Sequence, residues 1–565
     1  MRARIGRILV ARPLTNDPAP SSEAGRRRRR VALAVLIGTV AVGLRAWRLD
    51  WGLLDHRMAF PDELLVWGKY LRAFVPLSAN SFERPDTVAA LFYPTFFGYL
   101  AGLATALAHG LGLVPSPHAS LFEAVLVARI VSATAGVATV ALVGWLLWQA
   151  HSARAGLLGA ALAAVVPLEV IQSHLVSVDI LLSTGIVLCL VLSWRLARSG
   201  TSAAALAAGL VAGLTFGTKY TGLAVTVPIA WAAAEAAWRE RSLATLTRLV
   251  VLLLLGFALG FTIACPICVF SPQRLLRSMS MLTTAGNFEN LAFWRVELVP
   301  GLGIRGKPYI YQIFVALPYA LGWPLWLAAG AGLVSALRRH DLTDRILLLA
   351  LVAYLLPIGL SAFDALRYLL PLLPILSLLA ARFLAGPAGS GGRARLALAV
   401  LILAYTGALT VSQVGRFSFQ QQHEVAAWIE ASVERPPDGA LRVAVPHGMS
   451  PYFGLNKPLG EQGLEVLLVQ SGEWWRDQPE VFILPEWFAV QLERGGIPNP
   501  IMRADAAALR SGQMPYRMSK NFQSTYLQRD LYVALDPIFT TQLELGELGF
   551  EIWVRNDLQI RDQSR

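Results

Sequence analysis

Long apolar blocks alternate with short polar loops over most of this chain. The first block runs from Val31 to Leu49, and a polar segment follows over residues 50–91. Further blocks lie near residues 92–114, 122–149, 155–173, 178–196, 203–218, 222–238, 249–270, 309–337, 346–362, 368–384 and 396–414. A helix of about 17–25 apolar residues crosses the hydrocarbon core and satisfies its own backbone there. The pattern predicts a polytopic all-α membrane domain over residues 31–414, with roughly 12–13 transmembrane helices.

The pattern changes after residue 414, where long apolar blocks stop. Residues 423–433 have the spacing of a helix, and short apolar runs bounded by turn residues predict strands. These runs are residues 442–445, 465–469, 481–484 and 550–554. We therefore predict a small, soluble α/β domain over residues 415–565.

Charge predicts the orientation in the membrane. The net charge is +12, and Arg26–Arg30 directly precede the first block. We favour a topological role for this run over nucleic-acid binding, because arginine and lysine collect in cytoplasmic loops. Residues 1–30 are predicted to be a disordered, basic cytoplasmic tail. Nothing resembling a signal-peptide cleavage site follows the first block, so we expect it to be retained.

Basic loops follow alternate blocks. Their residues are Arg195 and Arg198, Arg239, Arg241 and Arg248, Arg338 and Arg339, and Arg393 and Arg395. This places the N-terminus in the cytoplasm and the C-terminal domain outside a bacterial plasma membrane. One conflict remains, because blocks 31–49 and 92–114 would both run outward. Either a crossing is hidden between Asp50 and Val114, or one block is wrongly bounded.

Composition agrees with a membrane protein. The chain is 55% hydrophobic and 15% charged, whereas soluble domains carry about 25% charged residues. Its three cysteines, Cys189, Cys265 and Cys268, all lie in apolar blocks. The Cys265–Cys268 spacing has no second pair or nearby histidine, so we interpret it as packing rather than a redox or zinc site. No disulfide framework is predicted.

The first outer loop carries adjacent acids, Asp62 and Glu63, after Pro61. Apolar residues recur from Phe60 to Phe74 at steps of three and four, which predicts an amphipathic helix in the membrane interface. On a helix the two acids point about 100° apart. Such a carboxylate could act as a general base for an acceptor hydroxyl. The alternative is that the acids only favour a helix start.

Other charged residues lie at or near block ends on the same predicted outer side. Asp179 opens one block shortly after His174, where the alternative is a solvated loop acid. Lys219, followed by Tyr220, could neutralise a phosphate or extend to lipid headgroups. Arg367 lies between two blocks and could clamp a phosphate. Pro371 and Pro374 are expected to bend the block that follows.

Arg129 lies inside a block and needs an anionic partner. His174 has no second histidine at ligand spacing, so we expect a structural residue rather than a metal ligand. No metal site is predicted. The sequence indicates no definite cofactor, and a divalent cation stays an open alternative.

Residues 26–414 carry a series of motifs whose order along the chain resembles that of the C-type glycosyltransferase (GT-C) superfamily. The resemblance is to the branch of protein O-mannosyltransferases and the lipid A aminoarabinose transferase. The motifs are Pro61-Asp62-Glu63, Tyr93-Pro94, Ala128–Ala133, the stretch 155–179, Gly217–Tyr220, and Arg367-Tyr368 with Pro371 and Pro374. The resemblance implies a GT-C fold with a lipid-facing cavity. It implies that Asp62 is the catalytic base, with Asp179 facing the same cavity. It also implies that Arg129, Lys219 and Arg367 bind the carrier phosphate.

One motif departs from the family pattern. Relatives often carry a charged residue or histidine before paired prolines, whereas this chain has Leu91-Phe92-Tyr93-Pro94-Thr95. This leaves open both the acceptor and the contact that Tyr93 would make.

The sequence therefore predicts a membrane glycosyltransferase. It would move a sugar from a polyprenyl-phosphate donor to a hydroxyl of a lipid, glycan or protein acceptor outside the cell, with inversion at the anomeric carbon. The partners expected are the donor, the acceptor and membrane lipids, without nucleic acid. A transporter or lipid flippase would instead show two related halves with broken spans, and we find no such repeat. A noncatalytic scaffold for the outer domain is the third alternative.

Overall fold

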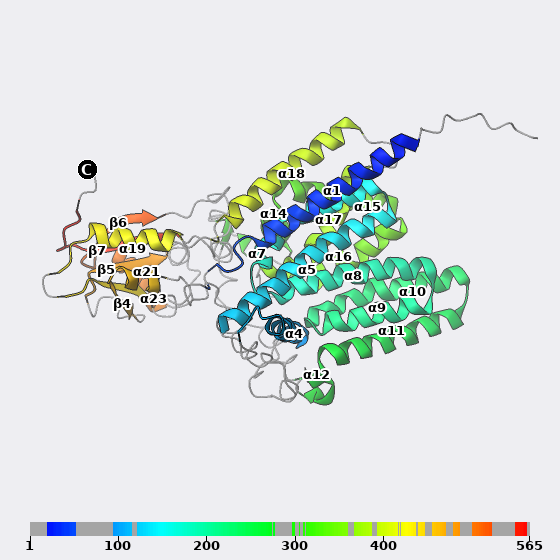
Figure 1. The fold of residues 1–565 in the computed structure, drawn as a ribbon, viewed down its shortest axis with the longest axis horizontal. Coiled ribbons are helices and arrows are strands. Elements are labelled where there is room, and N and C mark those ends of the chain that lie inside the picture. The colour runs from blue at the N-terminus through cyan, green and yellow to red at the C-terminus, as the bar shows by residue number, and fades with distance from the viewer. Residues whose placement is uncertain are drawn as a thin grey trace, which may run out of the picture.

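A computed structural model shows a largely helical domain joined to a smaller domain built around a sheet (Figure 1). The structure describes residues 20–51, 53, 94–115, 121–273, 275–276, 297–299, 304–305, 309–310, 312–359, 366–386, 392–415, 417, 420–436, 439–446, 455–469, 478–485, 500–522 and 549–561.

The helical domain follows the predicted apolar blocks closely. Its main helices are α1 (Pro20–Ala46), α4 (Phe96–Gly110), α5 (Leu121–Ala150), α6 (Ala153–Ala164), α7 (Pro167–Ser173), α8 (Val178–Ser199), α9 (Ser202–Phe216), α10 (Thr226–Glu240), α11 (Leu243–Ala264), α12 (Pro266–Phe270), α14 (Leu317–Leu321), α15 (Trp323–Arg339), α16 (Leu342–Gly359), α17 (Leu372–Ala385) and α18 (Arg393–Val414). Shorter elements are the 3-10 turns η2 (Tyr220–Val225) and η5 (Leu366–Leu369), the π-helical turn η4 (Gln312–Ala316), and the antiparallel pair β1 (Glu297–Val299) and β2 (Ile304–Arg305).

Several helices are long and apolar enough to cross a membrane. Five described helices meet that requirement alone, and up to seven spans result if each of two bent pairs counts as one. Shorter apolar helices, α9 and α17, lie among them. These helices confirm the prediction of a multi-pass membrane protein. The total of 12–13 spans remains a prediction.

Two predicted blocks are broken rather than straight. Between α6 and α7 the chain bends by 59°, next to Pro167. The predicted span 309–337 is wrong as one helix, because the chain turns by 120° before α15 at Gly322, whose φ is +81°. A proline removes a helical hydrogen bond, and glycine tolerates positive φ, so these residues explain both breaks. Pro371 and Pro374 do not bend α17, since they lie at its start.

The first spans also differ from prediction. Helix α1 begins at Pro20, so Arg26–Arg30 lie in a helix rather than in a disordered tail. Over the described residues 94–114 of the next block, the structure has the 15-residue α4, which Figure 1 shows nearly end-on beside the long α5. At about 1.5 Å per residue, such a helix is shorter than the hydrocarbon core. The conflict in the predicted orientations stays open, because residues 54–93 lie outside the part of the chain that the structure describes.

Close packing of α9 against α11 depends on glycine. Gly209 and Gly213 of α9 face the backbone of α11, and an added Cβ would overlap Leu253 or Phe257. Gly256 and Gly260 of α11 face α9 in the same way. Small residues at such a contact allow two membrane helices to approach closely.

Cys265 and Cys268 form a disulfide across the turn from α11 to α12. The prediction of packing without a disulfide was therefore wrong. Pro266 starts α12 immediately after Cys265, and this turn brings the two Cα atoms to 5.3 Å, within the usual range for a disulfide. Cys189 is a free, buried thiol.

The C-terminal domain contains a mixed sheet of five strands. They are β3 (Arg442–Pro446), β4 (Glu465–Val469), β5 (Val481–Pro485), β6 (Tyr516–Phe522) and β7 (Phe550–Arg555), in the order β4-β3-β5-β7-β6. Its helices are α19 (Gln420–Ser432), α21 (Asn456–Glu461) and α23 (Pro500–Arg510). The α/β prediction is confirmed. Strand β6 and helices α21 and α23 were not predicted.

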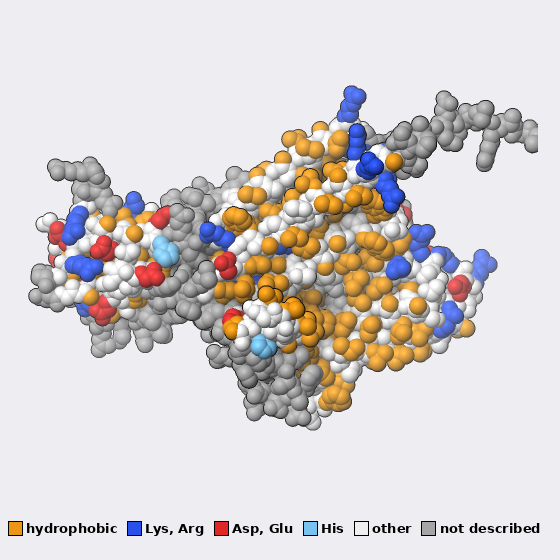
Figure 2. All heavy atoms as spheres, in the orientation of Figure 1, with side chains coloured by type: hydrophobic (Ala, Val, Ile, Leu, Met, Phe, Trp, Pro, Cys, Tyr) orange, Lys and Arg blue, Asp and Glu red, His pale blue; other side chains and the backbone are white. Residues whose placement is uncertain are grey.

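Basic residues gather at one end of the helical domain, as the blue spheres on the right of Figure 2 show. We call this the Arg-rich end; it carries Arg26–Arg30, Arg195, Arg198, Arg239, Arg241, Arg338, Arg339, Arg393 and Arg395. Helix α8 ends there and begins beside Asp179, and we call the opposite end the Asp179 end. Since α18 starts at the Arg-rich end, the sheet domain follows at the Asp179 end (Figure 1). This segregation agrees with the predicted orientation, with the Arg-rich end in the cytoplasm.

Candidate active site

Asp179 and Lys219 form a buried ion pair at the Asp179 end. Asp179 lies in the first turn of α8, and Lys219 lies between the end of α9 and η2. The lysine Nζ lies 2.6 Å from a carboxylate oxygen of Asp179. Both side chains are largely shielded from solvent. The two residues, predicted separately from the charges at block ends, therefore belong to one site.

Tyr368 brings a third predicted residue to this pair. Lys219 Nζ lies 4.3 Å from the centre of the Tyr368 ring, and the Arg367 guanidinium lies 5.7 Å from it. Cations near an aromatic face are attracted by the negative potential of the ring. Nearby, the Tyr354 hydroxyl donates to the hydroxyl oxygen of Thr221, 3.1 Å away. The starts of α8 and η2 and the short turn η5 thus meet in space, although they are far apart in the sequence.

Arg129 and His174 lie in a second cluster, beside the residues that lead into segment 50–91, the predicted first outer loop. Arg129 Nη1 donates to the carbonyl oxygens of Leu49 and Trp51, each at 2.8 Å, and its guanidinium lies over the Trp51 ring. The His174 ring nitrogens contact the carbonyl oxygens of Trp47 and Val170. In this structure both side chains hold protein backbone, and their predicted contact with a carrier phosphate remains a prediction.

Phe417 packs against two residues of this second cluster, His174 and Trp51. Its ring stacks on His174 with centroids 4.5 Å apart and lies 4.9 Å from Trp51. Phe417 follows α18 directly, so the end of the last helix contacts the root of the first outer loop. The Ser177 N–H donates to Ser132 Oγ, 3.1 Å away, one helical turn after Arg129. This bond links the second cluster to the start of α8 and hence to Asp179.

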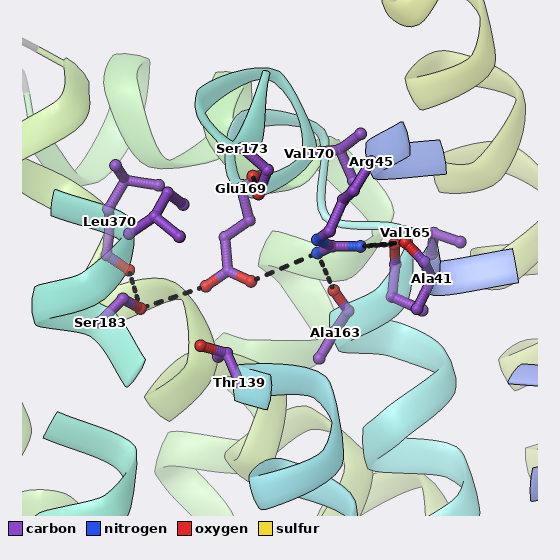
Figure 3. Close-up of polar contacts among 12 residues, drawn as sticks. Ala41, Arg45, Thr139, Ala163, Val165, Glu169, Val170, Ser173, Ser183 and Leu370 are labelled. Carbon is purple, nitrogen blue, oxygen red and sulfur yellow. Dashed lines mark hydrogen bonds and ion pairs between the residues drawn. The ribbon is translucent and has the colours of Figure 1, made fainter. Parts of the chain in front are cut away.

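A third buried pair, Arg45 and Glu169, lies beside Ser183 (Figure 3), which is about one helical turn after Asp179 on α8. Arg45 and Glu169 are almost fully buried, with 3.9 Å between their nearest charged atoms. Arg45 also donates to the carbonyl oxygens of Ala163 and Ala164, near the break between α6 and α7. Ser183 Oγ lies 3.5 Å from both Glu169 Oε1 and the Leu370 carbonyl oxygen. The pair therefore connects α1, α7 and α8 beneath η5.

Sequence reasoning missed this third pair and the contribution of Tyr368. An acid inside an apolar block was a usable signal for Glu169, because ionisable residues within spans are costly and are commonly paired. Tyr220 packs against Phe216, with ring centroids 5.7 Å apart. Asp62, Glu63 and Tyr93 lie outside the described residues. Among the described residues, no group of three or more His, Cys, Asp or Glu side chains could hold a metal ion.

Residues 119–268 match the model of a protein family described as dolichyl-phosphate-mannose-protein mannosyltransferase. That segment contains Arg129, His174, Asp179, Lys219 and Tyr220. The match confirms the predicted resemblance. It covers less than half of the chain, and Arg367 lies beyond it. No curated protein matches the chain significantly.

Two solved structures have related but distant folds. The structure of ArnT from Cupriavidus metallidurans bound to undecaprenyl phosphate aligns with 83% of this chain and 95% of its own, at 13% identity and a TM-score of 0.46. An oligosaccharyltransferase from Archaeoglobus fulgidus, in complex with zinc and sulfate, aligns with 88% of this chain and 72% of its own, at 13% identity and a TM-score of 0.45.

Proposed function

We propose that this protein is a membrane glycosyltransferase that uses a polyprenyl-phosphate-linked sugar as donor. The observation that carries the proposal is the meeting of Asp179, Lys219 and Arg367 around Tyr368. These residues come from separate elements, and two of them are cations held at one end of the helical domain. Such a group suits the phosphate of a lipid-linked sugar, whose charge grows as it leaves.

The family match supports the chemical class of the donor. The matched family is described by its use of a dolichyl-phosphate sugar, and the matched segment includes Lys219 and Asp179. A polyprenyl phosphate is the bacterial counterpart of that carrier. The predicted bacterial plasma membrane would place this carrier within reach of the site.

In the reaction proposed, Asp62 removes the proton of an acceptor hydroxyl. The hydroxyl oxygen then forms a bond to the anomeric carbon, while the bond from that carbon to the phosphate oxygen breaks. Polyprenyl phosphate leaves with the bonding electrons, and Lys219 and Arg367 stabilise its charge. Because a phosphate is already a good leaving group, the protein contributes mainly orientation and electrostatics. A single displacement inverts the anomeric carbon.

The remaining residues would position these groups. Asp179 would hold the Lys219 ammonium at the phosphate side of the site through their short ion pair. Arg129 and His174 hold the backbone that leads into the first outer loop, and so would help to set the position of Asp62. Glu63 and Tyr93 remain candidates for acceptor or donor contacts in the same loop region.

The proposal is tested with the full-length protein in proteoliposomes. A panel of radiolabelled polyprenyl-phosphate sugars serves as donor, and an envelope extract from the source organism supplies acceptors. We expect Asp62→Asn to lower transfer by about 10²–10⁴, the usual contribution of a general base. Asp50→Asn, a change of an exposed acid at the start of the same loop, is the matched control and should retain transfer.

The outcomes separate the three alternatives. Full transfer by Asp62→Asn would exclude this residue as the base. Label that crosses the bilayer without joining an acceptor would favour a flippase. Neither transfer nor movement of label with any donor would favour a scaffold. A product that keeps the configuration of the donor would rule out the single displacement.

A further inference from the structure

A hollow of about 420 Å³ lies at the Arg-rich end, between the end of α8 and the start of α9. Its polar lining residues, which we call the rim, are Arg195, Arg198, Ser199 and Thr201. Its wall is apolar and contains Leu192 and the alanines of α9. Arg195 and Arg198 lie 16 and 19 residues after Asp179 on α8, so about 24–29 Å of helix separates them from Asp179. The hollow is therefore distinct from the candidate active site.

Two aromatic rings hold the guanidinium groups of this rim. Arg195 lies 5.8 Å from the centre of the Trp145 ring, and Arg198 lies 4.7 Å from that of Trp194. Both arginines are exposed. A guanidinium that already rests on a ring loses less conformational freedom when an anion binds. The rim thus presents two positioned cations in one hollow.

No carboxylate within the described ranges forms an ion pair with these two arginines. Other arginines near this end are paired: Arg339 and Arg382 with Asp344, and Arg345 with Glu235. One acid lies close to the rim: Glu240, beside Gly200, accepts a hydrogen bond from Thr245. With two arginines and this one acid around it, the hollow has a net positive charge.

The start of α9 adds to this positive potential. Thr201 is its N-cap, and the Thr201 hydroxyl accepts the Ala204 N–H. The first turn of a helix of this length carries the positive end of the helix dipole and favours a phosphate nearby. Ser199 and Thr201 supply hydroxyl groups at the same rim.

The apolar surroundings indicate a lipid rather than a soluble anion. Trp145, under Arg195, also lines a second hollow of about 410 Å³ between α1, α5 and α6. That hollow is bordered by Gly38, Ala41, Gly144 and Trp148, and most of its surface is apolar. Tryptophan residues at a predicted membrane surface and an apolar surface beside two cations suit an anionic headgroup with its acyl chains.

We propose that Arg195 and Arg198 form a binding site for the headgroup of an anionic glycerophospholipid at the Arg-rich end. The two guanidinium groups bind the phosphate, and the alanines of α9 contact the first part of an acyl chain. This proposal needs no transferase activity, so it stands or falls independently of the function proposed above.

The test places the full-length protein in nanodiscs of phosphatidylcholine with increasing phosphatidylglycerol. Native mass spectrometry counts the phosphatidylglycerol molecules retained, and thermal unfolding follows their effect on stability. We expect Arg195→Gln with Arg198→Gln to weaken retention about ten- to thirtyfold and to abolish the rise in melting temperature, since each basic residue near a membrane surface contributes to anionic-lipid binding. Arg239→Gln with Arg241→Gln, which removes equal charge from exposed positions at the same end, is the matched control and should retain the lipid.

Each outcome decides the proposal. Equal loss in both double variants, or loss in neither, would mean that only the general surface charge attracts lipid and would overturn the site. Displacement of the lipid by millimolar inorganic phosphate would assign the hollow to a free anion instead. If the glutamine variant fails to fold, Arg195→Lys with Arg198→Lys keeps the charge but removes the planar guanidinium. Retention weakened in this lysine variant but not in Arg239→Lys with Arg241→Lys supports the site, and equal retention in the two overturns it.

Discussion

The two ends of the helical domain bury charge in different ways. At the Arg-rich end, Asp341 and Asp344 are bound by the guanidinium groups of Arg339 and Arg382, and we call these four residues the arginine–aspartate lock. At the Asp179 end, a single lysine ammonium contacts the carboxylate of Asp179. A guanidinium is a planar fork that fixes its partner in two places, whereas an ammonium is a compact charge on a flexible stem. The guanidinium contacts therefore suit a fixed structural link between helices. The lysine contact leaves an ammonium group that can turn toward an incoming anion.

The geometry of the lock supports a structural role. Arg339 donates to both oxygens of Asp344, at 3.0 and 3.1 Å, and Arg382 donates to Asp344 at 2.6 Å. The Asp344 N–H donates to Asp341, which also accepts from Arg382. Although its partial burial has the opposite effect, the hydrogen bonds from Arg382 and the Asp344 N–H hold the pKa of Asp341 below its usual range. The lock thus ties the α15–α16 turn to α17.

The largest effect should follow from Arg382→Met. This change leaves the fully buried Asp344 with one partner fewer, and breaking a buried pair in this way costs about 3–5 kcal/mol. We expect a clearly lower melting temperature in detergent and unchanged transfer per folded molecule. Arg338→Met removes an exposed arginine at the end of the same helix as Arg339 and should change neither quantity. A normal melting temperature for Arg382→Met would show that the lock is not structural.

Most of the helical fold could be predicted from the sequence, because the length of an apolar block directly indicates a membrane-spanning helix. Blocks 122–149 and 178–196 became α5 and α8 with nearly the same bounds. The break at Gly322 was missed, because local apolarity is the same on both sides of a turn. Asp179 and Lys219 could also be found from the sequence. Charge near a membrane span is costly, so charged residues at the ends of apolar blocks stand out as candidates.

The contacts among site residues could not be predicted from the sequence. Nothing local indicates that Tyr368 lies beside Lys219, or that Phe417 stacks on His174, because tertiary packing alone brings these pairs together. Arg129 was a predicted site residue, yet the sequence did not indicate that the backbone carbonyls of residues 49 and 51 would be among its partners. Residue types were thus predictable, whereas partners were not.

A double-variant cycle at the Asp179 end separates charge balance from function. Lys219→Met should lower both transfer, by roughly 10²-fold or more, and stability, because it leaves Asp179 buried without its lysine. Adding Asp179→Asn should restore most of the stability, since no buried carboxylate is then uncompensated. Transfer should stay low, because the cation is still absent. In the lock, by contrast, Arg382→Met with Asp344→Asn should leave transfer per folded molecule normal throughout.

The comparison between the two ends is decided by two measurements. The melting temperature is measured in detergent, and sugar transfer is measured with the donor panel in proteoliposomes. If the double variant Lys219→Met with Asp179→Asn recovered transfer together with stability, Lys219 would be a structural partner of Asp179, as in the lock. Lys219→Arg is the conservative variant, and it should keep the stability while changing the apparent KM for the donor more than kcat.

The smallest effect should follow from Glu169→Gln in the third pair, which resembles neither end. Arg45 and Glu169 are 3.9 Å apart, and the Arg45 guanidinium already donates to the carbonyl oxygens of Ala163 and Ala164. Glu169→Gln keeps the size of the side chain and can still accept from Ser183, so we expect a loss of only about 1–2 kcal/mol of stability. Arg45→Met should cost more, because it removes those bonds and leaves Glu169 buried without a cation. The order of the two melting temperatures is the measurement, and equal losses would show that the arginine acts only through Glu169.

Because Ser183 and Leu370 connect this pair to η5, a rise in the apparent KM of Glu169→Gln without a change in melting temperature would show that the pair also positions Arg367.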